Sequence, residues 1–312
     1  MFVVRRDIKS FYENVHTHEL QDKLTQDTRT PRQVKLYLDK FFAQHCASSI
    51  GLPRGVGLSA ILAELYMQEF DQDVRRIDGV YRYYRYCDDI LLFLTHIPEN
   101  LDLALAKILP EGMAFNLSKS RDHHIATTDG VPDEIEYLGY RFRVSDSTKG
   151  KFSRNVDVGI ADAKIRRLKS RVLATFMRYT TDHNFPMLRD RIRYLFSNYI
   201  VHRNSNAQRS ASHVRSGIYY NYKLCGLYGI KYSTDSKLYP PSLSELKAVD
   251  AFYHSLLTGP SSKFAPFLAR QLTPPQLQEL KKISAHKGHM LRMLVRFDPK
   301  DVAEIKRAWK NV

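Results

Sequence analysis

Three aspartates have a spacing that suits divalent-cation chemistry. Asp7 follows a short apolar run that begins at Phe2, and Asp88 and Asp89 interrupt an aromatic and aliphatic run over residues 81–95. Carboxylates that meet at strand ends can hold two Mg²⁺ ions about 4 Å apart, where one ion activates a hydroxyl and the other neutralises a triphosphate. Hard oxygen ligands with phosphate co-ligands favour Mg²⁺ over zinc, with Mn²⁺ as a substitute.

The two neighbouring aspartates are not expected to act equally. Adjacent residues of a strand point to opposite faces of a sheet, so only one of Asp88 and Asp89 shares a face with Asp7. We expect Asp7 and Asp88 to be metal ligands and Asp89 to be a supporting acid. The alternative is a pair of acidic turns without chemistry.

Hydrophobic periodicity predicts the elements that would position these acids. Phe2–Val4 has the composition of a short strand, and residues 81–95 have that of two strands joined by a tight turn that carries the acids. The other predicted elements are helices within residues 17–50, 58–70 and 101–109 and a strand pair around residues 135–144. The order strand, helix, acidic hairpin, helix and strand is that of a split βαβ unit with an antiparallel sheet, so the expected fold class is α+β.

A polar break near residue 150 divides the chain. Residues 145–150 interrupt the pattern of the first half, and we place a domain boundary between residues 148 and 149. Beyond it, helical spacing over residues 165–179, a capping-box pattern over residues 242–245, and prolines that open further helices indicate a mostly helical domain over residues 149–312.

The net charge of +15 is concentrated in the second half. Residues 1–150 carry 19 Lys and Arg against 22 Asp and Glu, whereas residues 151–312 carry 29 against 11. A basic half joined to a near-neutral half favours a part that binds a polyanion beside a part with another task. A merely solvated basic surface stays open, because net charge gives a sign and no chemistry.

Arginines and tyrosines alternate within this basic half. Cations neutralise phosphates and aromatic faces stack on bases, so we expect a nucleic-acid groove here. The alternative is a helical core of tyrosines covered by solvated arginines. The side chains expected to contact nucleic acid are Arg189, Arg191, Arg193, Arg203, Arg209 and Arg215.

Other residue types argue against several classes of protein. No run of about 20 apolar residues is present, so no membrane association is expected. The three cysteines have no paired spacing, which argues against disulfides and a zinc site and favours a reducing cytoplasm. The pairs His16/His18 and His123/His124 have metal-ligand character, but we expect no cysteine or acid to converge on them.

Five short segments along the first half share an order with the motifs of one polymerase family. The segments are Arg6–Tyr12, Gly51–Gly55 with Ser59, Tyr86–Asp89, Asn116–Lys119 and Glu136–Tyr140. They resemble motifs A to E of reverse transcriptases. Tyr-Cys-Asp-Asp alone would be a weak signal, whereas five motifs in order over residues 1–143 are a specific one. The resemblance implies an RNA-directed DNA polymerase, with a palm over residues 1–148 and a basic helical thumb and C-terminal region over residues 149–312.

The resemblance implies a role for the acids and for one lysine. Asp7 and Asp88 would bind two metal ions together with the backbone carbonyl of Ile8, and the ions would activate a primer 3′-hydroxyl and neutralise the triphosphate. Lys119 would face the triphosphate and protonate the leaving pyrophosphate. An ordinary surface lysine is the alternative at that position.

Further motif residues are implied to contact the nucleotide and the primer. Tyr12 lies where this family places an aromatic steric gate, which crowds a ribose 2′-hydroxyl and selects dNTPs; a core aromatic is the alternative. The loop with Gly55 would lie under the templating base pair, because glycine lets the backbone approach closely. The residues implied to bind the nucleotide are Tyr12, Pro53, Arg54, Gly55 and Ser59, and those implied to grip the primer are Tyr137, Leu138, Gly139 and Tyr140.

The resemblance also implies partners and a setting. The expected ligands are an RNA template and a DNA primer or product, with a structured non-coding RNA as a further partner. Reverse transcriptases place a fingers subdomain before motif A, so we expect fingers that are absent or truncated here, or supplied by an upstream segment or a partner protein. The motifs are most similar to those of bacterial defence-associated, abortive-infection and retron-like lineages, the type 3 defence group among them, which implies a cytoplasmic anti-phage role.

Three functions stay open at this point. The first is RNA-templated DNA synthesis. The second is a catalytically weak or inactive RNA-binding scaffold that retains the palm motifs. The third is untemplated or protein-primed DNA synthesis.

Overall fold

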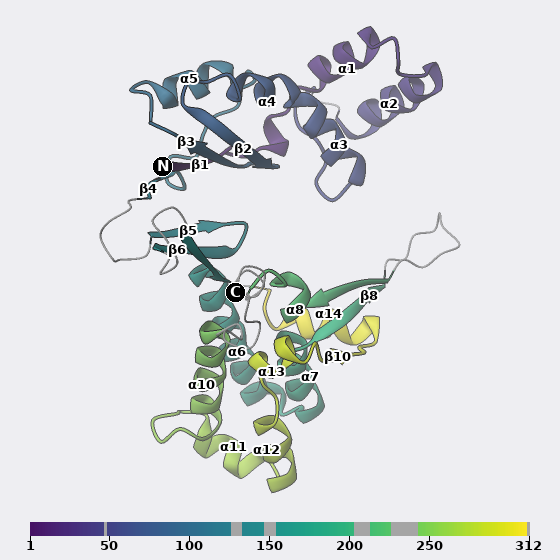
Figure 1. Cartoon of the computed structure of the whole chain (residues 1–312). Helices are drawn as coiled ribbons and strands as arrows, with labels where there is room; N and C mark the ends of the chain where they lie inside the picture. The colour runs from purple at the N-terminus through teal and green to yellow at the C-terminus, as the bar shows by residue number, and fades with distance from the viewer. Residues whose placement is uncertain (47–48, 126–132, 147–153, 203–212, 226–242, 311–312) are drawn as a thin grey trace. The chain divides into compact units, whose positions relative to one another are not determined.

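The computed structural model describes residues 1–46, 49–125, 133–146, 154–202, 213–225 and 243–310, and the chain divides into two compact units (Figure 1). The first unit is Met1–Asp129 and the second is Gly130–Val312. The boundary predicted between residues 148 and 149 lies outside the described residues, so it stays a prediction. The described chain combines helices with largely antiparallel sheets, as expected for an α+β protein.

The first unit is built on a four-stranded antiparallel sheet. Its strands are β1 (Phe2–Asp7), β2 (Val80–Tyr86), β3 (Asp89–Leu94) and β4 (Arg121–His124), in the order β2-β3-β1-β4. The predicted first strand and the acidic hairpin are confirmed. The edge strand β4 is not predicted, because its sequence Arg-Asp-His-His has no apolar alternation.

Helices complete the first unit. They are η1 (Tyr12–Asn14), α1 (Thr17–Gln26), α2 (Arg32–His45), α3 (Gly57–Tyr66), α4 (Gln68–Val74) and α5 (Leu101–Ile108). The predicted single helix over residues 58–70 is two helices that meet at Met67. Val4, Ile90 and Leu92 of the sheet belong to one buried cluster with Phe70 of α4, and α4 and α5 lie over the sheet in Figure 1. This core fixes the strand ends that carry the acids.

The second unit contains two three-stranded sheets. One has the order β5-β6-β7 and the other β10-β8-β9. The strands are β5 (Asp133–Tyr137), β6 (Tyr140–Asp146), β7 (Arg154–Ile160), β8 (Asn198–His202), β9 (His213–Gly217) and β10 (Leu294–Val295). The strand pair expected around residues 135–144 is confirmed as β5 and β6, whereas the strands after residue 150 are not predicted.

The remainder of the described second unit is helical, as predicted. The helices are α6 (Asp162–Asp182), α7 (Phe185–Phe196), α8 (Ile218–Asn221), α10 (Ser244–Thr258), α11 (Ala265–Gln271), α12 (Pro274–Lys281), α13 (Ala285–Met290) and α14 (Pro299–Arg307). The expected capping box of α10 does not form as predicted: Leu243 is the N-cap residue, and Ser242 lies outside the described residues.

The core of the second unit forms around α6. Val172, Phe176 and Tyr179 follow helical spacing on one face of α6 and are buried. The indole nitrogen of Trp309 donates to the hydroxyl of Thr175 at 3.0 Å, so the end of the described chain is tied to the same helix. None of the helices in the described ranges is long and apolar enough to cross a lipid bilayer.

Candidate active site

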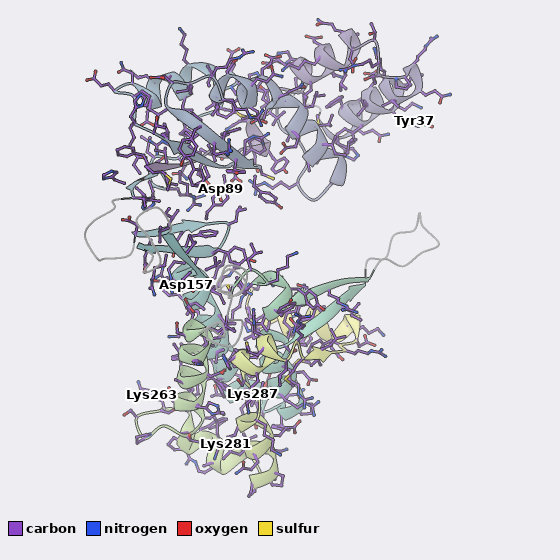
Figure 2. The ribbon with its side chains drawn as sticks, viewed as in Figure 1. Tyr37, Asp89, Asp157, Lys263, Lys281 and Lys287 are labelled. Atoms are coloured by element: carbon purple, nitrogen blue, oxygen red, sulfur yellow. The ribbon has the colours of Figure 1, made fainter. Side chains whose placement is uncertain are left out.

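The turn between β2 and β3 brings two acids to the end of β1. Asp7 and Asp89 are direct partners in the antiparallel ladder, and the amide of Ile8 donates to the carbonyl of Asp88 at 2.9 Å. Cys87 has a left-handed backbone with φ +53°, which allows the tight turn. Asp89 lies beside this turn at the start of β3 (Figure 2). The three acids therefore converge at one end of the sheet.

A lysine side chain binds the carboxylate of Asp7. Asp7 is only 3% exposed, and the ammonium group of Lys119 donates to both of its carboxylate oxygens at 3.0 Å. The segment before Lys119 is held against the strand, since the amide of Asn116 donates to the carbonyl of Asp7 at 2.7 Å. A cation on both oxygens shows that this carboxylate is placed to receive positive charge.

The two neighbouring aspartates have different surroundings. Arg5 donates to one carboxylate oxygen of Asp89 from Nε at 3.0 Å and from Nη2 at 2.8 Å. Burial raises the pKa of Asp88, and the negative charges of Asp7 and Asp89 raise it further. The charge of Asp89 is thus balanced by Arg5, whereas the negative form of Asp88 would be stabilised by a nearby cation.

The donor set at this end of the sheet fits divalent cations. The carboxylates of Asp7 and Asp88 are hard oxygen donors of the kind that Mg²⁺ and Mn²⁺ bind. Among the described residues, none donates a hydrogen bond to the carbonyl oxygen of Ile8, so that oxygen is available as a further metal ligand. The residues expected to be metal ligands are therefore brought together in one place.

Tyr12 borders the acidic turn. Its hydroxyl lies 3.7 Å from the sulfur of Cys87, and its ring packs edge-on against Phe11 at 5.3 Å between centroids. Burial raises the pKa of Tyr12 to about 12, with further contributions from Cys87 and from the charge of Asp88. The hydroxyl of Tyr12 therefore lies beside the turn that carries the acids.

The glycine-rich loop is attached to the same region. The amide of Leu52 donates to the carbonyl of Tyr12 at 2.8 Å, and the guanidinium group of Arg54 pairs with Glu13 through contacts of 2.5 and 2.9 Å. Gly55 has φ +83°, with open space where a side chain would be.

Ser59 stabilises that loop from the first turn of α3. Its side chain is buried, and its hydroxyl donates to the carbonyl of Pro53 at 2.7 Å. The hydroxyl therefore acts on the loop backbone. Its predicted role in nucleotide binding stays a prediction.

Arg85 of β2 stabilises the turn between β2 and β3 by a hydrogen bond to its backbone, and the sequence interpretation did not identify it. Its guanidinium group is buried and donates twice to Asp71, twice to Glu64 and once to the carbonyl of Cys87, at 2.8–3.1 Å. Tyr83 donates to the same Asp71 at 2.6 Å. The alternation of Tyr83 and Arg85 on β2, both facing inward, was the signal that could have identified this network.

The predicted primer-grip residues form a hairpin in the second unit. Tyr137 and Tyr140 face each other at the ends of β5 and β6. Leu138 and Gly139 have φ +50° and +82°, as in a two-residue turn of type I′. The hydroxyl of Tyr140 donates to the carbonyl of Asn221 at 3.0 Å. Binding of a primer by this hairpin stays a prediction.

The predicted nucleic-acid-binding arginines have different environments. Arg189 pairs with Asp190 at 2.9 Å, and Arg193 pairs with Glu279 at 2.8 Å. Arg191 is 1% exposed and pairs with Asp182 at 3.0 Å, so it packs inside the unit and presents no group to a phosphate.

The remaining arginines of that set are only partly described. Arg215 donates to the hydroxyl of Tyr220 at 3.0 Å. Arg203 and Arg209 lie outside the described residues. Contact of this set with nucleic acid stays a prediction.

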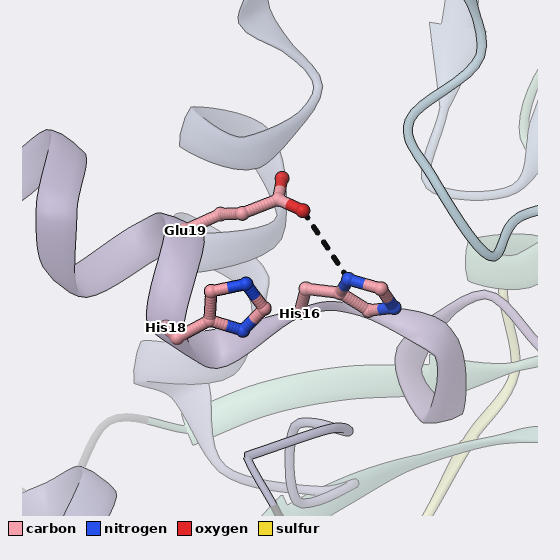
Figure 3. Close-up of side chains that lie close together, drawn as sticks. All are labelled: His16, His18 and Glu19. Atoms are coloured by element: carbon pink, nitrogen blue, oxygen red, sulfur yellow. Dashed lines mark hydrogen bonds and ion pairs between the residues drawn. The ribbon is translucent and has the colours of Figure 1, made fainter.

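One expectation about the histidines is wrong. An acid does converge on His16 and His18: ligand atoms of these residues and of Glu19 all lie within 4.8 Å of one another (Figure 3). The acid was missed because it is the next residue of the chain, and only the first turn of α1 brings its side chain back. His124 instead stacks on Phe2 with ring centroids 4.5 Å apart.

Comparison with known proteins covers the part of the chain that carries these acids. Residues 2–142 match the family model described as reverse transcriptase (RNA-dependent DNA polymerase). No curated protein shows a significant match to the chain. The matched residues include the acids, Tyr12, the glycine-rich loop and Lys119, and they extend into β6.

Proposed function

We propose that the chain is an RNA-directed DNA polymerase that extends a primer 3′ end by a two-metal mechanism at Asp7 and Asp88, because residues 2–142 match the reverse transcriptase family model. The observation that supports this proposal is the pairing of the two strand ends, in which the amide of Ile8 donates to the carbonyl of Asp88 at 2.9 Å. Reverse transcriptases bind a template and a primer and use divalent metal ions.

The residues of the site would have different roles in the reaction. Asp7, Asp88 and the carbonyl of Ile8 would hold the cations, which when bound activate the 3′-hydroxyl and neutralise the triphosphate. Asp89 would stay paired with Arg5 at 2.8 Å and support the site without binding a metal ion.

Lys119 can serve two partners in turn. Its side chain binds Asp7 at 3.0 Å and is 54% exposed, so it can leave that carboxylate without breaking a packed core. A divalent cation on Asp7 would compete with the ammonium group for the same two oxygens. The released ammonium group would then face the triphosphate and donate a proton to pyrophosphate as it leaves.

Tyr12 and the glycine-rich loop would select and position the substrates. An aromatic ring beside the acidic turn leaves no room for a 2′-hydroxyl, which favours dNTPs over rNTPs. Gly55 lets the backbone approach the templating base pair, since no Cβ stands in the way. Arg54 belongs to this loop, and its guanidinium group is exposed. It can therefore release the carboxylate of Glu13 and bind a phosphate instead.

Primer extension with labelled dNTPs and Mg²⁺ on an RNA template tests the proposal. Asp88→Asn removes one charge and keeps the side-chain shape, so we expect the extension rate to fall by at least about 100-fold. Asp78→Asn changes an exposed acid of the same unit and is the matched control, with an expected rate equal to that of the unmodified chain.

Each other outcome identifies a different function. Extension that Asp88→Asn leaves unchanged would refute the site. Nucleic-acid binding without synthesis would indicate a scaffold, and product without template would indicate untemplated or protein-primed synthesis. Omission of divalent metal, followed by separate additions of Mg²⁺ and Mn²⁺, identifies the ion.

We further propose a role in anti-phage defence in the bacterial cytoplasm. The support is the resemblance of the motifs to those of bacterial defence-associated lineages. Plaque counts on cells that express the unmodified chain or Asp88→Asn test this role. Equal plaque counts in the two strains would refute it and leave the polymerase proposal intact.

A further inference from the structure

Three side chains at the start of α1 have the types and spacing of metal ligands. Ligand atoms of His16, His18 and Glu19 lie within 4.8 Å of one another (Figure 3). Nδ1 of His16 is 3.2 Å from a carboxylate oxygen of Glu19. Two ligands of one tetrahedral Zn²⁺, each at about 2.0–2.1 Å, are about 3.4 Å apart. One pair of atoms therefore already has the separation that a shared ion requires.

The backbone fixes the orientation of His16. This residue is the N-cap of α1, with an extended backbone that forms a bridge to Ile50. Gly112 lies against the Nε2 edge of the ring, where a Cβ atom would stand 2.8 Å from Nε2, and Gly112 has φ +78°. The imidazole is thus confined with Nδ1 towards Glu19, whereas the exposed ring of His18 is free to turn towards both.

A buried hydroxyl beside these side chains lacks a well-aligned partner. Tyr66 of α3 is 2% exposed, and its hydroxyl has no partner at normal hydrogen-bond geometry among the described residues, although Glu19 and the main chain of His16 lie close enough to interact with it. Burial raises the pKa of Tyr66 to about 12; the nearby charge of Glu19 also raises this pKa, whereas the main chain of His16 lowers it. Buried hydroxyls in native proteins usually have a partner, and an unpaired one is a common sign of an ordered water or ion.

We propose that His16, His18 and Glu19 bind one Zn²⁺ ion, with a fourth position for a water molecule that the hydroxyl of Tyr66 contacts. Two imidazoles and a carboxylate form a known three-ligand set for zinc. Imidazole ligands favour transition metals, whereas Mg²⁺ takes oxygen ligands, so this site differs in chemistry from the one at Asp7 and Asp88. The ion would tie the start of α1 to α3 and stabilise the first unit.

The competing explanation is a helix cap alone. A carboxylate at the third helical position commonly interacts with the N-cap residue, and a negative charge there is favourable near the helix N-terminus. That explanation accounts for the contact between His16 and Glu19. It gives no role to His18, so metal content can separate the two explanations.

Zinc titration of the full chain tests the proposal. The protein is stripped with a chelator and titrated with Zn²⁺ in Mg²⁺-free buffer, all in an Asp88→Asn background that weakens cation binding at the polymerase site. We expect one Zn²⁺ per chain by elemental analysis and calorimetry. His18→Gln and Glu19→Gln should each weaken binding by at least about 10-fold, the range seen when even outer-shell partners are removed.

A second histidine–acid pair supplies the matched control. His96 contacts Asp78 at 3.0 Å and is exposed, and no third ligand joins this pair among the described residues. His96→Gln should leave zinc affinity unchanged. Because His18 is exposed, His18→Gln should fold normally, which circular dichroism checks.

Two results would overturn the proposal. One is an unmodified chain that binds no Zn²⁺ at micromolar concentrations, which would leave the three side chains as a helix cap. The other is equal affinity in the unmodified chain, His18→Gln and Glu19→Gln, which would assign any bound zinc to other residues. Neither result bears on polymerase activity, so the two proposals fail separately.

Discussion

The buried guanidinium group of Arg85 should stabilise the first unit and the acidic turn together. Arg85→Met keeps a side chain of similar length and removes five hydrogen bonds, two to Asp71, two to Glu64 and one to the carbonyl of Cys87. Asp71 then keeps the hydroxyl of Tyr83 at 2.6 Å as a partner. The substitution leaves a mostly buried carboxylate without its cation.

The expected loss in the free energy of unfolding follows from the exposure of each partner. Breaking a buried ion pair costs about 3–5 kcal/mol, because one charge stays buried and unpaired. The side chain of Arg85 is 3% exposed and that of Asp71 is 20% exposed, whereas that of Glu64 is 57% exposed and adds little. We therefore expect Arg85→Met to cost about 3 kcal/mol, in the lower part of that range. With a urea m-value of about 2 kcal/mol/M, the midpoint would fall by about 1.5 M.

Hydrogen exchange of the β3 amides across a urea series measures this loss. The only tryptophan, Trp309, belongs to the second unit, so its fluorescence does not report on the first. Arg76→Met is the matched control, because Arg76 pairs with Asp73 at 3.0 Å on the surface. The control should change the free energy of unfolding by no more than about 0.5 kcal/mol. Equal midpoints for the two variants would show that the network around Arg85 does not stabilise the unit.

Three further substitutions test other positions. Tyr12→Ala should raise rNTP incorporation relative to dNTP incorporation while Tyr12→Phe keeps the ratio, and an unchanged ratio in Tyr12→Ala would remove Tyr12 from the gate. Asp250→Ala should lower the free energy of unfolding by about 1–2 kcal/mol in Trp309 fluorescence melts. The reason is that Asp250 accepts hydrogen bonds at the start of α13 from the hydroxyl of Ser284 at 2.6 Å and from the amide of Ala285 at 2.7 Å. An unshifted melt would contradict this. Gly217→Ala should cost more than about 2 kcal/mol by the same melts, since Gly217 has φ +120° and a Cβ atom would clash with the carbonyl oxygen of Ser197. A cost below about 0.5 kcal/mol would show that the backbone can relax there.

The acidic hairpin was predictable because local signals and chain order agree there. Apolar residues flank Asp88 and Asp89 on both sides, and alternation along β3 buries Ile90 and Leu92. For this reason the sequence predicts both the sheet and the meeting of its acids. The ladder partner of Asp7 is nevertheless Asp89, although the expected alternation places Asp88 on the face of Asp7; Asp88 lies in the turn before β3.

Other features depend on contacts that no local pattern encodes. Arg191 lies in a run that suits phosphate binding, yet the packing of α7 against α6 buries it beside Asp182. The convergence of Glu19 on His16 depends on where α1 begins, which is set by a backbone bridge to Ile50. Burial and helix starts depend on the tertiary fold, so single-residue chemistry gives the wrong environment at both places.

Charge balance connects the site to its proposed chemistry. Asp7, Asp88 and Asp89 face two cations, Arg5 and Lys119, so the five groups together carry one net negative charge. The side chain of Arg5 is 21% exposed and that of Lys119 is 54% exposed, so Lys119 is the cation that can leave. In the proposed mechanism its departure would leave two net negative charges on the remaining four groups, which would raise the affinity for divalent cations while the lysine binds a triphosphate. Removal of Lys119 should therefore strengthen the binding of divalent cations at Asp7, because the competing ammonium group is gone.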